Sequence, residues 1–122
     1  METPKPGRPV RGSRTGRPIM ALLDLLGRRW MLRIIWELRE GRFGFRALQE
    51  RCDAMSPSVL RQRLLELQEA GIVLQDDQGM YGLTQEGAEL FKALAPLHHW
   101  AMRWAEREAL RGDSSGEQHP TE

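Results

Sequence analysis

The sequence predicts a mostly α-helical domain with one small β-hairpin, and three observations support this fold class. Apolar residues recur at helical spacing in several segments that glycine or proline separates. Two short apolar runs, residues 72–75 and 80–83, flank the turn-forming stretch DDQG. A long helical pattern follows the second run. The 122 residues suffice for one modest core, so we expect a single domain.

Three helices are predicted in the first half of this domain. The first covers residues 19–26, opens with Pro18 and closes at Gly27. The second covers residues 29–39, and its apolar stripe at 3.6-residue spacing is formed by Met31, Ile34, Ile35 and Leu38. The stretch GRFGF then makes a turn. The third helix is short and covers residues 46–51.

The fourth helix, over residues 56–70, is the most clearly patterned segment. Ser56 followed by Pro57 is a suitable N-cap and first-turn pair, and Gly71 ends the helix. Three leucines are predicted to face inward: Leu60, Leu64 and Leu67. The opposite side carries Ser58, Arg61, Gln62 and Leu65, with Ser56 and Arg63 at its margins.

A long final helix follows the hairpin. Thr84 is predicted to cap it, and Pro96 is expected to bend it. Its apolar positions include Leu90, Phe91, Leu94, Leu97, Ala101 and Trp104. The order helix, helix, short helix, capped helix, hairpin and long helix is that of a winged helix-turn-helix.

Both ends of the chain differ from this domain, which we place at residues 18–111. Residues 1–17 are rich in proline, glycine and arginine, and residues 112–122 contain three acidic groups and no basic one. Neither segment could bury enough apolar surface to offset the entropy of ordering. We therefore expect a disordered basic arm and a disordered acidic tail.

The charges are distributed unevenly within the domain. Residues 28–63 contain nine arginines and four acidic residues, whereas residues 64–111 contain four basic and eight acidic residues. This split indicates that one face of the protein binds a polyanion.

The predicted DNA contacts fall into three groups. Arginine pairs with guanine and glutamine with adenine, so base readout is assigned to Ser58, Arg61 and Gln62. Backbone contacts are assigned to Arg28, Arg29, Arg46, Ser56 and Arg63. Unspecific attraction is assigned to Arg8, Arg11, Arg14 and Arg17.

Other function classes lack support in the sequence. Cys52 is the only cysteine, so no internal disulfide is possible and a reducing compartment is expected. We find no export signal and no run of apolar residues long enough to span a membrane, and we expect a cytoplasmic protein. The sequence shows no catalytic constellation of a nucleophile, a base and a group that orients the base. It also has no glycine-rich phosphate-binding loop after a predicted strand. His98 and His99 are adjacent, which does not suit one metal. We expect no enzymatic activity, no cofactor and no metal.

Several segments together resemble the HxlR family of bacterial winged-helix transcription regulators, which is related to the MarR type. They are LLDLLGRRWMLRIIWEL, GRFGFRALQE, SPSVLRQRLLELQEAGIV, YGLTQEG and PLHHWAMRWAE, within residues 18–106. The resemblance implies DNA reading by the fourth helix and a homodimer formed by N- and C-terminal dimerisation helices. The dimer contacts that it implies are Ile19, Leu22, Leu23, Leu94, Leu97, Trp100, Ala101 and Trp104.

The sequence departs from the family in two places. Many members have a cysteine before the proline that opens the first helix, and some use it as a redox or electrophile sensor. Arg17 stands there in this chain, so that mechanism is expected to be absent unless Cys52 replaces it. We interpret Cys52 as a half-buried structural thiol. The DDQGMY wing is short and acidic, so we expect it to add little DNA affinity.

Two hypotheses of function remain open at this point. The first is a dimeric, sequence-specific regulator that binds double-stranded DNA. The alternative is a winged-helix protein-protein interaction module, in which the arginine-rich face binds an acidic partner and DNA affinity is unspecific. A small-molecule effector is compatible with the first hypothesis, and the sequence does not identify one.

Overall fold

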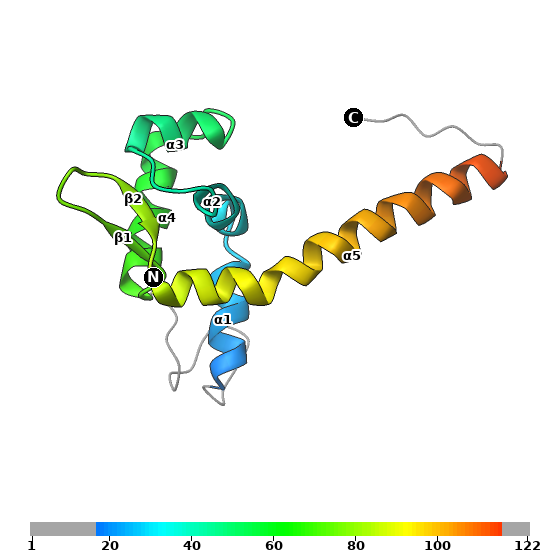
Figure 1. The fold of residues 1–122 in the computed structure, drawn as a ribbon, viewed down its shortest axis with the longest axis horizontal. Coiled ribbons are helices and arrows are strands. Elements are labelled where there is room, and N and C mark those ends of the chain that lie inside the picture. The colour runs from blue at the N-terminus through cyan, green and yellow to red at the C-terminus, as the bar shows by residue number, and fades with distance from the viewer. Residues whose placement is uncertain (1–16, 116–122) are drawn as a thin grey trace. The chain divides into compact units, whose positions relative to one another are not determined.

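The computed structural model describes residues 17–115 and confirms a mostly helical winged-helix fold with one antiparallel hairpin (Figure 1). Its elements are α1 (Pro18–Leu26), α2 (Met31–Leu38), α3 (Phe45–Arg51), α4 (Pro57–Glu69), β1 (Val73–Gln75), β2 (Tyr81–Leu83) and α5 (Gln85–Ser115). The chain divides into two compact units, one ending at Phe91 and the other beginning at Lys92. The helix α5 contributes to both, and we describe each unit by itself.

The predicted elements are all present, and two boundaries differ by several residues. The helix α2 begins at Met31 instead of residue 29, because Trp30 has a left-handed backbone with a φ of 76°. The helix α5 continues to Ser115, past the predicted domain end at residue 111, so residues 112–115 are helical. Residues 1–16 and 116–122, with the rest of the predicted arm and tail, lie outside the described residues.

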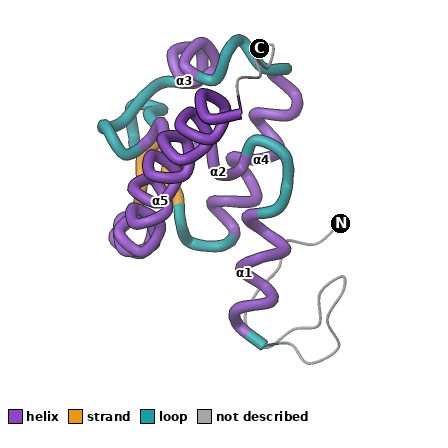
Figure 2. Tube along the Cα trace, turned by 90° about the vertical axis from the view of Figure 1, so that its right-hand side faces the viewer, coloured by secondary structure: helices purple, strands orange, loops and turns teal. Residues whose placement is uncertain are grey.

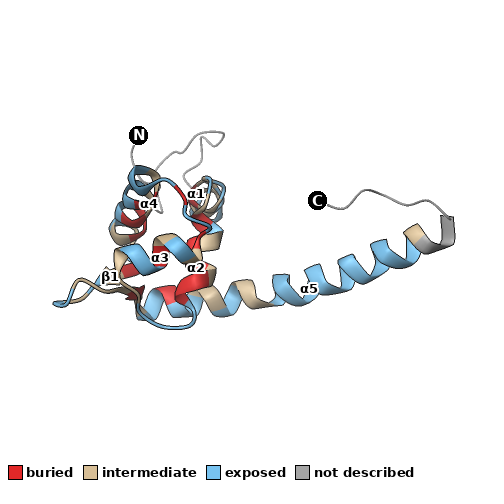
Figure 3. Ribbon diagram, turned by 90° about the horizontal axis from the view of Figure 1, so that it is seen from above, coloured by how far each residue is buried: buried red, intermediate tan, exposed pale blue. Residues whose placement is uncertain are grey.

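One apolar core holds the first unit together. Its fully buried side chains come from α2, α3, α4 and the turn before α4: Met31, Ile34, Ile35, Leu48, Cys52, Leu60, Leu64 and Leu67. Figure 3 shows these buried positions in red along the helices of this unit. The predicted inward leucines of α4 are therefore confirmed, which leaves the opposite side of that helix exposed.

The hairpin is small and is joined closely to the elements around it. Its strands pair in the register Val73↔Leu83 and Gln75↔Tyr81, and Figure 2 shows them in orange among the purple helices. Phe43 and Tyr81 exchange two backbone hydrogen bonds, of 2.9 and 2.8 Å, which form a separate antiparallel bridge between β2 and the segment before α3.

The junction between hairpin and α5 is capped as predicted. The Thr84 Oγ1 accepts from the Gly87 amide at 2.9 Å and donates to the Gly71 carbonyl at 2.6 Å. A Cβ on Gly87 would lie 2.2 Å from the Ile72 carbonyl oxygen, so only glycine fits there.

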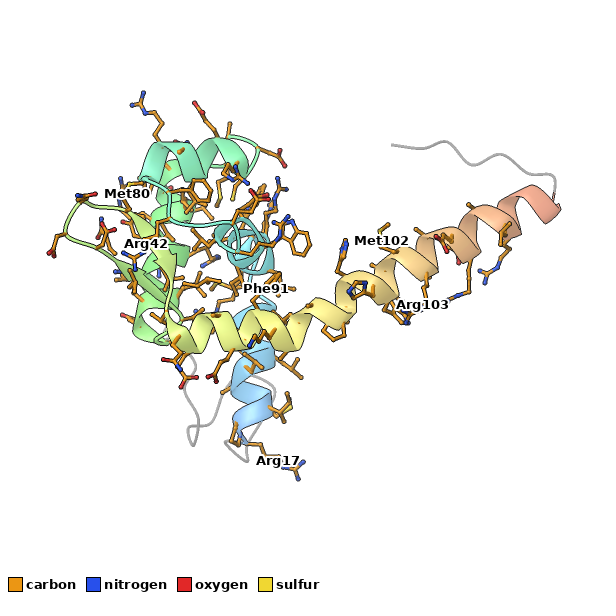
Figure 4. All side chains as sticks on the ribbon, viewed as in Figure 1. Arg17, Arg42, Met80, Phe91, Met102 and Arg103 are labelled. Carbon is orange, nitrogen blue, oxygen red and sulfur yellow. The ribbon has the colours of Figure 1, made fainter. Side chains whose placement is uncertain are left out.

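The second unit consists of helical residues from Lys92 onward. The helix continues through Pro96, and every residue from Pro96 to Arg111 is exposed. The Trp100 and Trp104 rings are stacked, with centroids 5.7 Å apart. Figure 4 labels Met102 and Arg103 on this part of the helix. A helix with large apolar side chains and no buried face is typical of an element that packs against another chain.

Candidate nucleic-acid interface

The exposed side of α4 carries the side chains that the sequence assigned to base readout. Ser58, Arg61 and Gln62 are all exposed, opposite the buried leucines. Ser56 caps the helix, although weakly, because its Oγ is 3.5 Å from the Val59 amide and 3.0 Å from the Ser58 Oγ. The N-terminal half of α4 thus presents hydroxyl, guanidinium and amide groups to solvent.

Arg61 is supported from the neighbouring helix. Its guanidinium carbon lies 4.8 Å from the centroid of the Phe45 ring, at the start of α3. A cation over an aromatic face is attracted to it, and the flat guanidinium keeps its edge free for hydrogen bonds. Arg61 is therefore partly preorganised, while its donors remain available to an acceptor outside the protein.

Two further arginines are accessible for contact with a DNA phosphate. Arg46 on α3 and Arg29 before α2 are exposed, and together with Arg61 they form no ion pair with any described residue. Arg29 makes a loose contact with the Trp30 ring, 5.9 Å from its centroid. These three side chains can neutralise phosphate charge without breaking an internal pair.

Arg28 and Arg63, also assigned to the DNA backbone, are instead engaged within the protein. Both form ion pairs with the buried Glu66 carboxylate of α4: the Arg28 Nη1 lies 3.0 Å from its Oε2, and the Arg63 Nη1 donates to its Oε1 at 2.9 Å. Arg28 is 10% exposed and also contacts Asp24 at 3.4 Å. The Arg63 Nε donates to the Arg29 carbonyl at 2.8 Å. These contacts attach α4 to the turn between α1 and α2.

Glu66 is the centre of this cluster. Burial disfavours its ionised form, but the hydrogen bond from Gln62 and the charges of Arg63 and Arg28 outweigh it, so its pKa is lowered. The Gln62 Nε2 donates to Glu66 at 3.0 Å, which occupies one of its two amide hydrogens. The second amide hydrogen and the amide oxygen of Gln62 are not used in this bond.

The same cluster lines an open pocket of about 550 Å³ beside α4. Its wall is formed by Leu23, Asp24, Gly27, Arg28, Gln62, Arg63 and Glu66. Because the carboxylates and guanidiniums in this wall pair with one another, the pocket has no uncompensated charge of either sign.

The four remaining arginines between residues 28 and 63 are also ion-paired. The pairs are Arg33 with Glu37 and Asp53, Arg39 with Glu40, Arg42 with Asp76, and Arg51 with Glu37 and Glu40. The charge excess in the sequence therefore does not translate into an equally basic surface. Only the i to i+4 spacing of Arg33 and Glu37 was a signal in the sequence for any of these pairs.

The wing is built around Asp76. Its Oδ1 accepts from the Gln78 and Met80 amides, both at 2.9 Å, and its Oδ2 pairs with Arg42 at 3.1 Å. These contacts, first of all the Met80 amide, lower the pKa of Asp76. Figure 4 shows Arg42 and Met80 at the hairpin. Asp76 is thus paired with Arg42, and the exposed Asp77 gives the wing tip a negative charge.

Cys52 is more deeply buried than predicted. Its side chain is fully enclosed in the core, and this burial raises the pKa of the thiol to about 11. A thiol protonated at neutral pH and shielded from solvent is a poor nucleophile. The structure places no reactive cysteine among residues 17–115.

The residues assigned to a dimer interface are largely exposed. Ile19 and Leu23 on α1 are 54% and 53% exposed, and Leu97, Trp100 and Trp104 on α5 are 58%, 47% and 50% exposed. Ala101 is exposed, and Leu22 and Leu94 are half-buried. Large apolar side chains at this exposure are unusual on a monomer surface when they gather on one element.

Comparison with protein-family models gives a match to the HxlR-like helix-turn-helix over residues 25–109. The chain belongs to this family. An HxlR-family assignment agrees with the resemblance in the sequence and with the fold of the first unit.

The chain is also similar to individual relatives, among them transcription regulators. The uncharacterized HTH-type transcriptional regulator YvaP of Bacillus subtilis is 31% identical over 88 residues, which cover 67% of this chain and 82% of YvaP. The crystal structure of quinone-bound YodB from B. subtilis is 30% identical with a TM-score of 0.65, over 70% of this chain and 94% of YodB. A MarR-family regulator from Enterococcus faecalis is also 30% identical, with a TM-score of 0.66, over 75% of this chain and 88% of the other.

These relatives support DNA-binding transcription regulation as the function of this HxlR-family chain, and its family consists of regulators, not enzymes. Within residues 17–115, no helix combines the length and the apolar character needed to cross a membrane.

Proposed function

We propose that this protein is a homodimeric, sequence-specific transcription regulator that reads the major groove of DNA with α4. The observation that carries the proposal is the exposed N-terminal half of α4, where Arg61 rests on Phe45 beside Ser58. A helix that follows a short turn and presents arginine near its start has the geometry for contacts to base edges.

The residues divide into two roles. Ser58, Arg61 and Gln62 supply base readout, and Gln62 does so with the amide hydrogen and the oxygen that Glu66 does not use. Arg29, Arg46 and Ser56 contact phosphates, and the arm of Arg8, Arg11, Arg14 and Arg17 adds unspecific attraction. Arg28 and Arg63 act mainly by holding α4 through Glu66, because contact with a phosphate would require breaking a buried pair.

The dimer is formed by the exposed apolar residues of α1 and α5. A two-fold symmetric dimer would place two copies of α4 in successive major grooves, with half-sites about one helical turn apart. The acidic wing contributes little to affinity, because Asp77 repels phosphate.

Selection from random duplex DNA tests the proposal. The purified protein is incubated with a random library at near-physiological salt, and the retained DNA is sequenced. We expect a motif with two-fold symmetry. Arg61→Ala should lose about 1–3 kcal/mol on the selected site and show a weaker base preference. Arg39→Ala, which removes an arginine remote from α4 in sequence, is the matched control and should bind as the parent does.

Retention of DNA without an enriched motif would contradict the proposal. It would leave unspecific attraction as the only DNA function and favour the acidic-partner alternative. That alternative has less support on this surface, because most of the arginines that it requires are paired with the protein's own carboxylates.

A further inference from the structure

The turn between α3 and α4 has an unusual backbone. Asp53 and Ala54 are consecutive, lack the freedom of glycine, and both have a left-handed φ, of 59° and 55°. Aspartate tolerates this region better than most residues, but alanine does not. Such a pair persists only where surrounding contacts determine the conformation. This turn also decides where α4 begins, since Ser56 and Pro57 follow within three residues.

The contacts that determine the turn come from a distant part of the chain. The Arg33 Nη1 donates to the Asp53 Oδ2 at 3.0 Å, and its Nη2 donates to the Arg51 carbonyl at 2.7 Å. Within the turn, the Ala54 amide donates to the Gln49 carbonyl at 2.9 Å. One guanidinium from α2 thus holds the last carbonyl of α3 and the first left-handed residue after it.

Arg33 is itself fixed in place. Its Nε donates to the buried Glu37 carboxylate at 2.9 Å, and the other oxygen of Glu37 accepts from the Arg51 Nε at 3.0 Å. Arg33 lies on α2 between Met31 and Ile34, which are both fully buried. The guanidinium therefore connects the turn to the helix that contributes these fully buried core residues.

We propose that Arg33 and Asp53 are positioning residues for DNA binding, and this inference rests on the proposed function of α4. Their ion pair keeps the turn in its left-handed form and so fixes the direction in which α4 leaves α3. Neither residue contacts DNA. Without the pair, the turn relaxes and Ser58 and Arg61 lose their register on the bases, whereas contacts to phosphate, which tolerate displacement, are retained.

The test compares binding to the selected operator with binding to a scrambled duplex of equal length. Asp53→Ala and Arg33→Ala should lower operator affinity by about tenfold or more and leave scrambled affinity within about twofold. Asp53→Asn retains an oxygen acceptor and tolerates left-handed φ, so it should restore most of the operator affinity. Arg39→Ala, which removes another ion-paired guanidinium beside α2, should change neither value.

A purely structural role would lower both affinities by the same factor, because only the folded fraction would change. That result would overturn the inference. So would a folded Asp53→Ala protein whose ratio of operator affinity to scrambled-duplex affinity equals that of the parent. If Arg33→Ala does not fold, the two affinities of Asp53→Ala are sufficient for the test, since this substitution leaves the contacts among Arg33, Glu37 and Arg51 intact. A parent without operator preference would instead refute the proposed function, before any variant is compared.

Amide hydrogen exchange gives a second readout that does not depend on DNA. In Asp53→Ala the Ala54 amide should exchange faster than in the parent, while the amide of the core residue Ile34 should not change. Equal exchange at Ala54 in both proteins would show that Asp53 does not hold the turn, and would also overturn the inference.

Discussion

The Phe45 ring lies directly beneath the guanidinium of Arg61, with 4.8 Å between the ring centroid and the guanidinium carbon. The two residues belong to different helices, α3 and α4, so the contact orients the side chain that we propose reads DNA from outside its own helix. An aromatic support of this kind reduces the rotamer entropy that Arg61 loses on binding.

Phe45→Leu should therefore weaken operator binding by about two- to fivefold, which corresponds to the roughly 0.5–1 kcal/mol of an exposed cation–π contact. A double-mutant cycle with Arg61→Ala checks this by fluorescence anisotropy. In the Arg61→Ala background, Phe45→Leu should have no further effect on DNA binding. Additive losses would mean that Phe45 acts on DNA binding through some other residue.

Glu66→Gln should lower the free energy of unfolding by about 3 kcal/mol at pH 7, because it removes the buried negative charge that pairs with both Arg28 and Arg63. Urea denaturation measures the change. Glu50→Gln, an exposed substitution on α3, is the matched control and should stay within about 0.5 kcal/mol of the parent.

The stabilisation by Glu66 should also depend on pH. Its pKa is lowered in the folded protein from an ordinary value of 4.5. The group therefore stabilises the fold fully above pH 4.5, and this contribution is lost as the pH falls through the lower, folded pKa. The stability difference between parent and Glu66→Gln should be largest near neutral pH and shrink below pH 4.5. A difference that grew on acidification would contradict the lowered pKa.

Cys52 should not react in the folded protein. With a pKa of about 11 and a fully buried side chain, its thiol should be alkylated about 100-fold more slowly in buffer at pH 7.5 than in urea. Iodoacetamide labelling followed by mass spectrometry measures both rates. Treatment with diamide should likewise leave operator affinity unchanged. Rapid labelling without denaturant would show that the core around Cys52 opens.

Trp104→Ala should weaken dimerisation by about 2–4 kcal/mol, because large aromatic side chains contribute most to interfaces. Sedimentation velocity over a range of concentrations checks this. Arg103→Ala, at the neighbouring exposed position, is the control and should dimerise as the parent does. A Trp104→Ala protein with unchanged self-association would place the interface elsewhere.

Local signals in the sequence were sufficient to predict the elements of the fold. Pro18, the Ser56–Pro57 pair and Thr84 mark helix starts, and each acts within a few residues of itself. Trp30 was the exception, since nothing in its side chain indicates a left-handed backbone.

The candidate site was predicted less completely, because charge along the chain does not reveal pairing in space. Arg28 is separated from Glu66 by 38 positions, and Arg42 and Asp76 are 34 positions apart. A count of charges treated those arginines as free, and only the fold shows that they are engaged. Arg33 was overlooked for the same reason, since its partner Asp53 follows 20 residues later.

The connections at the base of the hairpin limit how this wing can vary or be redesigned. Thr84 bonds to Gly71, and Gly87 lies against the Ile72 carbonyl, so an added residue at either strand end would separate the hairpin from α5. Asp77 and Gln78, at the tip of the wing, are both exposed. Basic substitutions at Asp77 and Gln78, which would extend charge toward a DNA groove, should therefore be tolerated, whereas insertions at the strand ends should not.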